Sequence, residues 1–144
     1  MESAITKTKF RSGYVAVTGR PNVGKSTITN ALIGAKVAIV SNKPGTTRTR
    51  IQGIMHGESS QIVFVDTPGL AIPQGKLGAF MQSEAKAALD GIDALLVVVQ
   101  AGHIIEIDKH ILDRFRSLPI KKVIAVNKTD SVSPEKLAAA LSEF

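Results

Sequence analysis

The chain has 144 residues, enough for one domain with a hydrophobic core, and hydrophobic residues make up 44% of it. It contains no cysteine, which excludes disulfides and thiolate chemistry, and no apolar run approaches the roughly 18 residues of a membrane span. Residues 1–12 lack the apolar core of a signal peptide, so a cytoplasmic protein is expected. The net charge of +6 fits either a polyanionic partner such as RNA or an ordinary basic surface that also serves a nucleotide.

Predicted strands and helices alternate along the chain after residues 1–12, which we expect to form a flexible leader. Short apolar or β-branched runs predict strands, and apolar residues at helical spacing predict helices. The strands are expected at residues 14–18, 51–56, 61–66, 94–99 and 122–127, and the helices at residues 26–33, 76–89, 107–118 and 134–144. A short polar turn separates the second strand from the third, which predicts an antiparallel hairpin.

The later elements carry the clearest burial patterns. Continuous apolar residues predict that the strands at 94–99 and 122–127 are buried on both faces. The side chains expected to face inward are Ile107, Ile111, Phe115 and Leu118 in the third helix and Leu137, Leu141 and Phe144 in the last. The alternation of elements predicts an α/β fold whose sheet is mostly parallel, with one antiparallel edge strand.

One loop fits the pattern G-x-x-x-x-G-K-[ST], which is typical of a phosphate-binding loop between a strand and a helix. Its backbone N–H groups can surround a phosphate, and the helix that follows adds its positive N-terminus. Lys25 would bring a positive charge to the β- and γ-phosphates, and Ser26 would offer a hydroxyl to Mg²⁺. The residues of this loop are Gly19, Arg20, Pro21, Asn22, Val23, Gly24, Lys25 and Ser26.

A second motif, Asp66-Thr67-Pro68-Gly69, also follows a predicted strand. An aspartate in this place can hold Mg²⁺, usually through water, and the N–H of Gly69 can reach a γ-phosphate. Because ligands of parallel sheets bind beyond the carboxyl ends of the strands, we expect this motif to lie beside the phosphate-binding loop.

The third motif, Asn127-Lys128-Thr129-Asp130, follows the last predicted strand. The carboxylate of Asp130 can accept two hydrogen bonds from adjacent N–H donors, which guanine has and adenine lacks. Asn127 can join the base to the phosphate-binding loop, and the stem of Lys128 can lie across the base. The motif therefore predicts selectivity for guanine.

A polar loop at residues 41–50 contains two adjacent threonines. A threonine in a mobile loop can give its hydroxyl to Mg²⁺ and its N–H to the γ-phosphate, a contact that exists only in the triphosphate state. Either Thr46 or Thr47 could serve in this way, and an ordinary polar surface loop is the competing interpretation.

Together these motifs resemble the translation-factor-related GTPases, and within them the Era family of ribosome-assembly GTPases. The resemblance is most specific at residues 12–16, 19–27 and 46–51. It implies a three-layer P-loop GTPase fold with an Era-type GTPase domain over residues 13–144, Mg²⁺ as cofactor, and ribosomal RNA and the small ribosomal subunit as partners. By resemblance, Thr27 and Leu70 join the GTP-binding residues, Thr47 is the Mg²⁺ ligand, and the catalytic set is Lys25, Thr47, Asp66 and Gly69.

The chain departs from the family pattern in three places. Gly45 stands where Era proteins usually have glutamine, and Pro44-Gly45 resembles a sister family with two tandem GTPase domains. Leu70 stands where many small GTPases have a water-orienting glutamine, and Asn22 matches an asparagine that ligates K⁺ in several GTPases. The family continues into a final strand and helix and a KH domain, which we expect to be missing, with lower stability and weaker guanine binding as the result.

The sequence thus predicts a GTPase that hydrolyses GTP with Mg²⁺ and acts as a switch in small-subunit assembly. The alternatives are a nucleotide- or RNA-binding fragment without turnover, and a sister-family GTPase in tRNA modification or large-subunit assembly. The resemblance leaves peripheral association with the inner membrane open. His56, His103 and His110 have no second ligand at metal spacing, so we expect them to be solvated or capping residues.

Overall fold

The computed structural model describes residues 9–34, 50–66 and 87–142 of the chain. Within these ranges five strands form one sheet in the order β2-β3-β1-β4-β5. The strands are β1 (Arg11–Thr18), β2 (Arg50–His56), β3 (Ser60–Asp66), β4 (Ala94–Gln100) and β5 (Lys121–Asn127). The helices are α1 (Lys25–Ile33), α3 (Glu106–Arg116), the short 3-10 helix η2 (Thr129–Ser131) and α4 (Pro134–Leu141).

The sheet is parallel except at one edge. β1 runs parallel to both β3 and β4, and β4 runs parallel to β5. β2 pairs antiparallel with β3, and Gly57 N–H donates to Ser60 O at 2.8 Å in the turn that joins them. The predicted hairpin and mostly parallel sheet are therefore confirmed, and the carboxyl ends of β1, β3, β4 and β5 meet at one edge.

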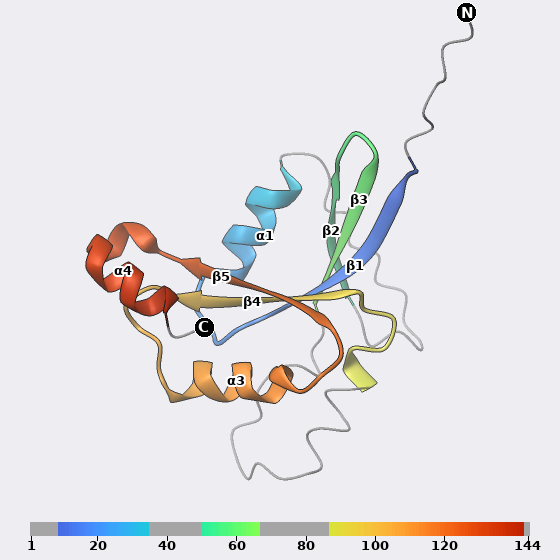
Figure 1. Cartoon of the computed structure of the whole chain (residues 1–144). Coiled ribbons are helices and arrows are strands. Elements are labelled where there is room, and N and C mark those ends of the chain that lie inside the picture. Colours follow the sequence, from blue (N-terminus) through green and yellow to red (C-terminus); the bar gives the residue numbers. More distant parts are fainter. Residues whose placement is uncertain (1–8, 35–49, 67–86, 143–144) are drawn as a thin grey trace, which may run out of the picture.

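Helices cover both faces of the sheet, with α1 on one side and α3 on the other (Figure 1). Because successive strand residues face opposite ways, β4 contributes to two cores. Leu95 and Val97 pack in the cluster that contains Phe115 of α3, whereas Leu96 and Val98 pack in the cluster that contains Val23. The three-layer α/β arrangement that the sequence predicts is thus confirmed.

β5 is less buried than its apolar sequence predicts. Its first three residues are exposed, and Val123 keeps 58% of its surface exposed. The reason is its place at the edge, where β4 is its one strand partner and no described element covers Val123. The prediction of a strand buried on both faces holds for β4 and is wrong for β5.

The inward faces of the last two helices also differ from the sequence prediction. In α3 the buried residues are Asp108, Ile111 and Phe115, whereas Ile107 is 44% exposed. An acidic residue thus takes the inward position that the apolar pattern gave to its neighbour. α4 begins as predicted, with Ser133 Oγ accepting from Lys136 N–H at 3.4 Å, but it buries Ala140 rather than Leu141.

The predicted helix at residues 76–89 lies almost wholly outside the described ranges. Of the helices that the structure describes, none combines the length and the apolar character needed to cross a membrane.

The core on the α3 side predicts a contrast between two positions of that helix. Phe115 is 1% exposed, so Phe115→Ala should lower the free energy of unfolding by about 3–5 kcal/mol through lost burial and a cavity. Ile107→Ala, on the same helix but at an exposed position, should cost less than about 1 kcal/mol. Urea unfolding of the two variants measures both values, and similar losses would contradict this packing.

Candidate functional site

Two of the predicted motifs, far apart in sequence, are joined directly at the carboxyl edge of the sheet. Asn127, the last residue of β5, donates from Nδ2 to the carbonyl oxygen of Val23 at 2.8 Å. Lys128 donates from Nζ to the carbonyl oxygen of Asn22 at 2.8 Å. The loop of residues 19–26 is therefore fastened to the end of β5.

At Gly19 and Gly24 the loop has backbone conformations and close contacts that favour glycine over any residue with a side chain. Gly19 has φ +148° and Gly24 has φ +98°, and a Cβ at Gly19 would collide with the carbonyl oxygen of Val98. A Cβ at Gly24 would collide with the side-chain amide of Asn127. The same contact that joins the two motifs thus requires glycine at position 24.

Helix α1 begins directly after the loop, and its N-terminus has no side-chain cap. The N-cap is Gly24, and the first turn contains no acidic residue. The unpaired N–H groups of the first turn and the helix dipole make this end suitable for an anion. Ser26 lies in that turn with an exposed side chain, as does Thr27.

Lys25 is held over the loop by the loop's own carbonyl groups. Its Nζ donates to Gly19 O at 2.9 Å and to Arg20 O at 2.8 Å. An ammonium group has three N–H donors, so one more direction remains for a phosphate oxygen. Burial lowers the pKa of Lys25, and the charge of Asp66 acts in the opposite direction.

Asp66 ends β3, directly beside the loop. Its backbone is paired in register with Val17 of β1, two residues before Gly19. This register places Asp66 at the same edge as the phosphate-binding loop, and its charge acts to raise the pKa of Lys25. The sequence predicted this convergence, and the geometry of the described residues confirms it.

The end of β5 is shaped by a lysine in a left-handed conformation. Lys128 has φ +58°, and its carbonyl oxygen accepts from Ser131 Oγ at 2.6 Å. This turn carries Thr129 and Asp130 into η2, where the carboxylate of Asp130 is exposed and makes no hydrogen bond or ion pair among the described residues. Asp130 thus projects from the same edge with its acceptors available.

Several predicted site residues lie outside the described ranges. They are Thr46, Thr47, Thr67, Pro68, Gly69 and Leu70.

Sequence reasoning missed three residues that hold Arg20 and Lys128 in place, namely Asp108, His103 and Gln100. Arg20 donates from Nε to Asp108 at 3.1 Å and from Nη2 to His103 O at 3.0 Å, and Gln100 Oε1 lies 3.5 Å from Lys128 Nζ. Asp108 had a readable signal, because it stands three residues before Ile111 and seven before Phe115, within the apolar stripe of its helix. The other two had none.

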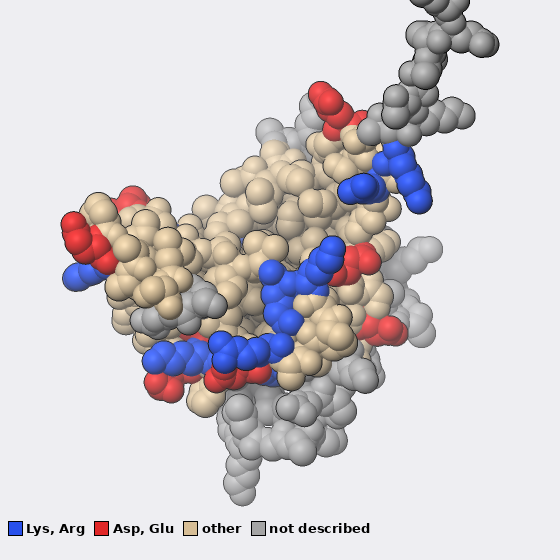
Figure 2. Space-filling model, viewed as in Figure 1, with Lys and Arg blue, Asp and Glu red and all other residues tan. Residues whose placement is uncertain are grey.

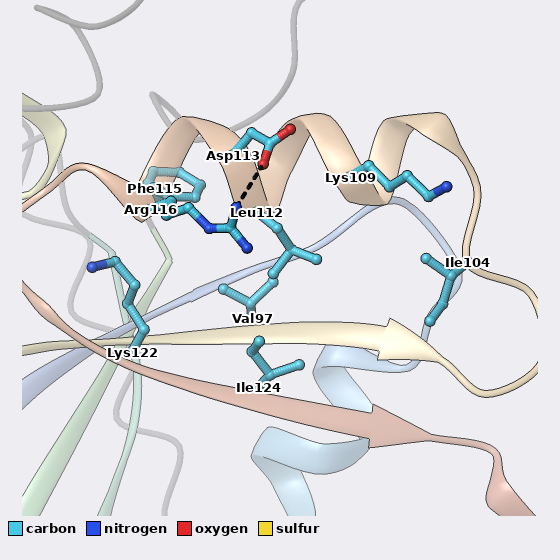
Figure 3. A pocket seen from close by; sticks show the side chains of 9 residues that line it. All are labelled: Val97, Ile104, Lys109, Leu112, Asp113, Phe115, Arg116, Lys122 and Ile124. Carbon is cyan, nitrogen blue, oxygen red and sulfur yellow. Dashed lines mark ion pairs between the residues drawn. The ribbon is translucent and has the colours of Figure 1, made fainter. Parts of the chain in front are cut away.

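A pocket of about 530 Å³ lies elsewhere, between α3 and the strands β4 and β5 (Figure 3). Apolar side chains such as Val97 and Ile124 form its floor, and charged ones such as Lys109 and Lys122 line its rim. Of the predicted site residues that the structure describes, none lines it. Figure 2 shows a row of basic side chains over α3 with acidic side chains beside it, in keeping with an ordinary solvated surface.

The lowered pKa of Lys25 predicts how its contribution to stability depends on pH. Between the lowered pKa of the folded chain and the ordinary value of 10.5, the unfolded chain binds more protons at this residue. The free energy of unfolding of the wild type relative to Lys25→Met should therefore rise as the pH increases through this window. Urea unfolding of both proteins from about pH 8 upward measures the difference, and a flat or falling difference would contradict the burial of the ammonium group.

Comparisons with known proteins agree with this geometry. The model of the family described as 50S ribosome-binding GTPase matches residues 14–128. The GTPase Era of Clostridium acetobutylicum is 46% identical over 136 residues, which are 94% of this chain and 46% of that protein. The GTPase Era of Lactobacillus helveticus is 42% identical over 136 residues, which are 94% of this chain and 45% of that protein. The chain thus spans about half the length of these relatives.

Solved structures give the same answer. A variant of Aquifex aeolicus Era bound to GDP.AlF4- has a TM-score of 0.65 and 38% identity, with 92% of this chain and 46% of that chain covered. A structure of Era with MgGDPNP and a 16S ribosomal RNA segment has the same TM-score and identity, with 93% and 46% covered. The G domain of the T. maritima FeoB iron transporter has a TM-score of 0.60 and 26% identity, with 91% of this chain and 83% of that chain covered. This chain belongs to the 50S ribosome-binding GTPase family, a family of GTP hydrolases, and has an Era-type GTPase domain.

Proposed function

We propose that the chain binds GTP with Mg²⁺ and hydrolyses it to GDP and phosphate. The observation that carries the proposal is the pair of hydrogen bonds from Asn127 and Lys128 to the backbone of Val23 and Asn22. They hold a motif suited to guanine against a loop suited to phosphates. One nucleotide could therefore contact both at once.

Guanine selectivity would come from Asp130. Its exposed carboxylate has no partner among the described residues and can accept from the two adjacent N–H groups of guanine. Asn127 already donates to the loop through Nδ2, which leaves its Oδ1 for the base. The stem of Lys128 would lie against the base plane.

The residues at the phosphate end fit a magnesium ion. Ser26, Asp66 and Thr47 offer a hydroxyl, a carboxylate and a second hydroxyl, and oxygen atoms are the ligands that Mg²⁺ prefers. When bound, Mg²⁺ would neutralise the charge of the β- and γ-phosphates. The backbone N–H groups of the loop, with the exception of Pro21, which has none, would hold the phosphate oxygens together with Lys25 and the N–H of Gly69.

Hydrolysis would rest on positioning and charge. Water attacks the γ-phosphorus, the bond to the bridging oxygen breaks, and GDP leaves with that electron pair. Leu70 cannot orient the water, and Thr67 and Pro68 would only shape the loop. We propose that K⁺ near Asn22 supplies additional positive charge. Unaided turnover should then be on the order of 10⁻⁴–10⁻² s⁻¹.

We further propose that this GTPase acts as a switch in small ribosomal subunit assembly through ribosomal RNA. The support is one relative, Era, whose structure holds MgGDPNP together with nucleotides of 16S ribosomal RNA. The family's description, 50S ribosome-binding GTPase, favours the alternative of a role on the large subunit. The comparisons give no such support for a role in tRNA modification.

Phosphate release from GTP tests the proposed reaction. The wild type with Mg²⁺ should release phosphate, and more quickly in K⁺ buffer than in Na⁺ buffer. Lys25→Ala should abolish release, whereas Lys109→Ala, which changes a half-exposed lysine of α3, should not. Equal rates in the two buffers would contradict the role of K⁺. GDP binding without any phosphate release would favour a binding module instead.

Two glycines give a matched test of the phosphate-binding loop. Gly24 and Gly34 both have positive φ, so alanine at either should cost about 1–2 kcal/mol of stability. Only at Gly24 would the added Cβ collide with Asn127, since nothing lies within 4 Å at Gly34. Gly24→Ala should therefore lower GDP affinity by more than about tenfold, and Gly34→Ala should leave it nearly unchanged. Calorimetry measures both, and equal affinities would contradict the joined site.

A further inference from the structure

The ion pair between Arg20 and Asp108 differs from the other ion pairs of the described residues in its burial. The side chains are 13% and 0% exposed, whereas the pairs of Lys109 with Glu106 and of Arg116 with Asp113 are at least half exposed on both sides. Exposed pairs contribute little to stability, but a buried and hydrogen-bonded pair fixes the position of both partners. The pair links the phosphate-binding loop to α3, across 88 residues of sequence.

Asp108 is itself fixed in place by its helix. The oxygen that accepts from Arg20 also accepts from Ile105 N–H at 3.0 Å, and Asp108 N–H donates to Ile105 O at 2.9 Å. An acidic residue in the first turn also interacts favourably with the helix dipole. The carboxylate is therefore a rigid anchor.

Arg20 connects Asp108 to the phosphate-binding loop. Its guanidinium holds both Asp108 and the carbonyl oxygen of His103, while its own carbonyl oxygen accepts from Lys25 Nζ at 2.8 Å. The side chain thus faces α3, and the backbone faces the lysine that would meet the phosphates. A shift of Arg20 would move that carbonyl and Lys25 with it.

We infer that Asp108 is a positioning residue for nucleotide binding, which acts through Arg20 to hold the loop and Lys25 in their binding arrangement. The inference rests on the proposed function for its ligand. It also assigns Arg20 a structural contact with α3 rather than a direct contact with the phosphates. The competing role, Arg20 as a direct phosphate ligand, predicts that removing Asp108 would leave binding unchanged or stronger, because the guanidinium would be released.

Nucleotide affinity tests the inference in four variants. Asp108→Asn keeps an oxygen for Ile105 N–H but removes the charge that holds Arg20, and it should weaken binding of GDP with Mg²⁺ by about tenfold. Arg20→Ala should do the same, and the double variant should be no weaker than Arg20→Ala alone. Arg20→Lys keeps the charge but not the forked contact, so its affinity should be intermediate.

Arg116→Ala is the matched control. It removes an arginine that also faces an aspartate of α3, Asp113 at 4.0 Å, but that is 79% exposed. Its affinity for GDP should equal that of the wild type. All titrations are done at a temperature where melting curves show every variant to be folded, so a loss of affinity reports the loop and not unfolding.

A measurement without nucleotide separates this inference from the proposed function. In ¹⁵N spectra of the nucleotide-free chain, the Nε–H of Arg20 should exchange more slowly than that of Arg116. Asp108→Asn should shift the amide signals of Gly24 and Lys25, which Arg116→Ala should leave in place. Rapid exchange of Arg20 Nε–H, unshifted loop signals, or unchanged GDP affinity in Asp108→Asn would each overturn the inference. A wild type that shows these signals but binds no GDP would instead overturn the proposed function.

Discussion

The hydrogen bond from the side-chain amide of Asn127 to the backbone of Val23 is the contact on which the site depends. It joins residues 104 positions apart, one at the end of β5 and the other in the loop after β1, and these two strands are not neighbours in the sheet. β4 lies between them and sets their relative register. Since β3, β1, β4 and β5 run parallel to one another, the motifs that follow β1, β3 and β5 lie at the same edge. A single amide can then join the loop to the motif at the end of β5.

This arrangement makes the nucleotide site depend on β5, the edge strand that is less buried than β4. β5 is at the edge of the described sheet and leaves Val123 largely exposed. Its last residue, Asn127, and the next residue, Lys128, nevertheless donate the two hydrogen bonds that join this strand end to the loop. Whatever loosens β5 should therefore affect the nucleotide site before it affects the core around Phe115. The loop is held from a second side by the ion pair of its Arg20 with Asp108, which lies on the buried face of α3. Two independent attachments thus fix one short loop.

Much of this could be predicted from sequence because the strongest signals are local. The strand-loop-helix order around Gly19 and Lys25, the hairpin, and the strand ends that carry Asp66 and Asn127 were all predicted and are found. What failed depends on tertiary position. Nothing in the apolar run of β5 shows that it lies at an edge. The spacing of Asp108 from Ile111 and Phe115 permits an inward position, but a carboxylate is expected to face solvent until Arg20 is seen opposite it. The roles of Thr47 and Gly69 remain predictions.

The central claim is that the joined loop and strand end form a guanine-nucleotide site, and calorimetric titration of GDP and ADP with Mg²⁺ tests it most directly. The predicted result is heat on adding GDP and none on adding ADP. The carboxylate of Asp130 can accept from the two adjacent N–H donors of guanine, and adenine lacks this pair of donors. Equal binding of the two nucleotides, or binding of neither, would contradict the account.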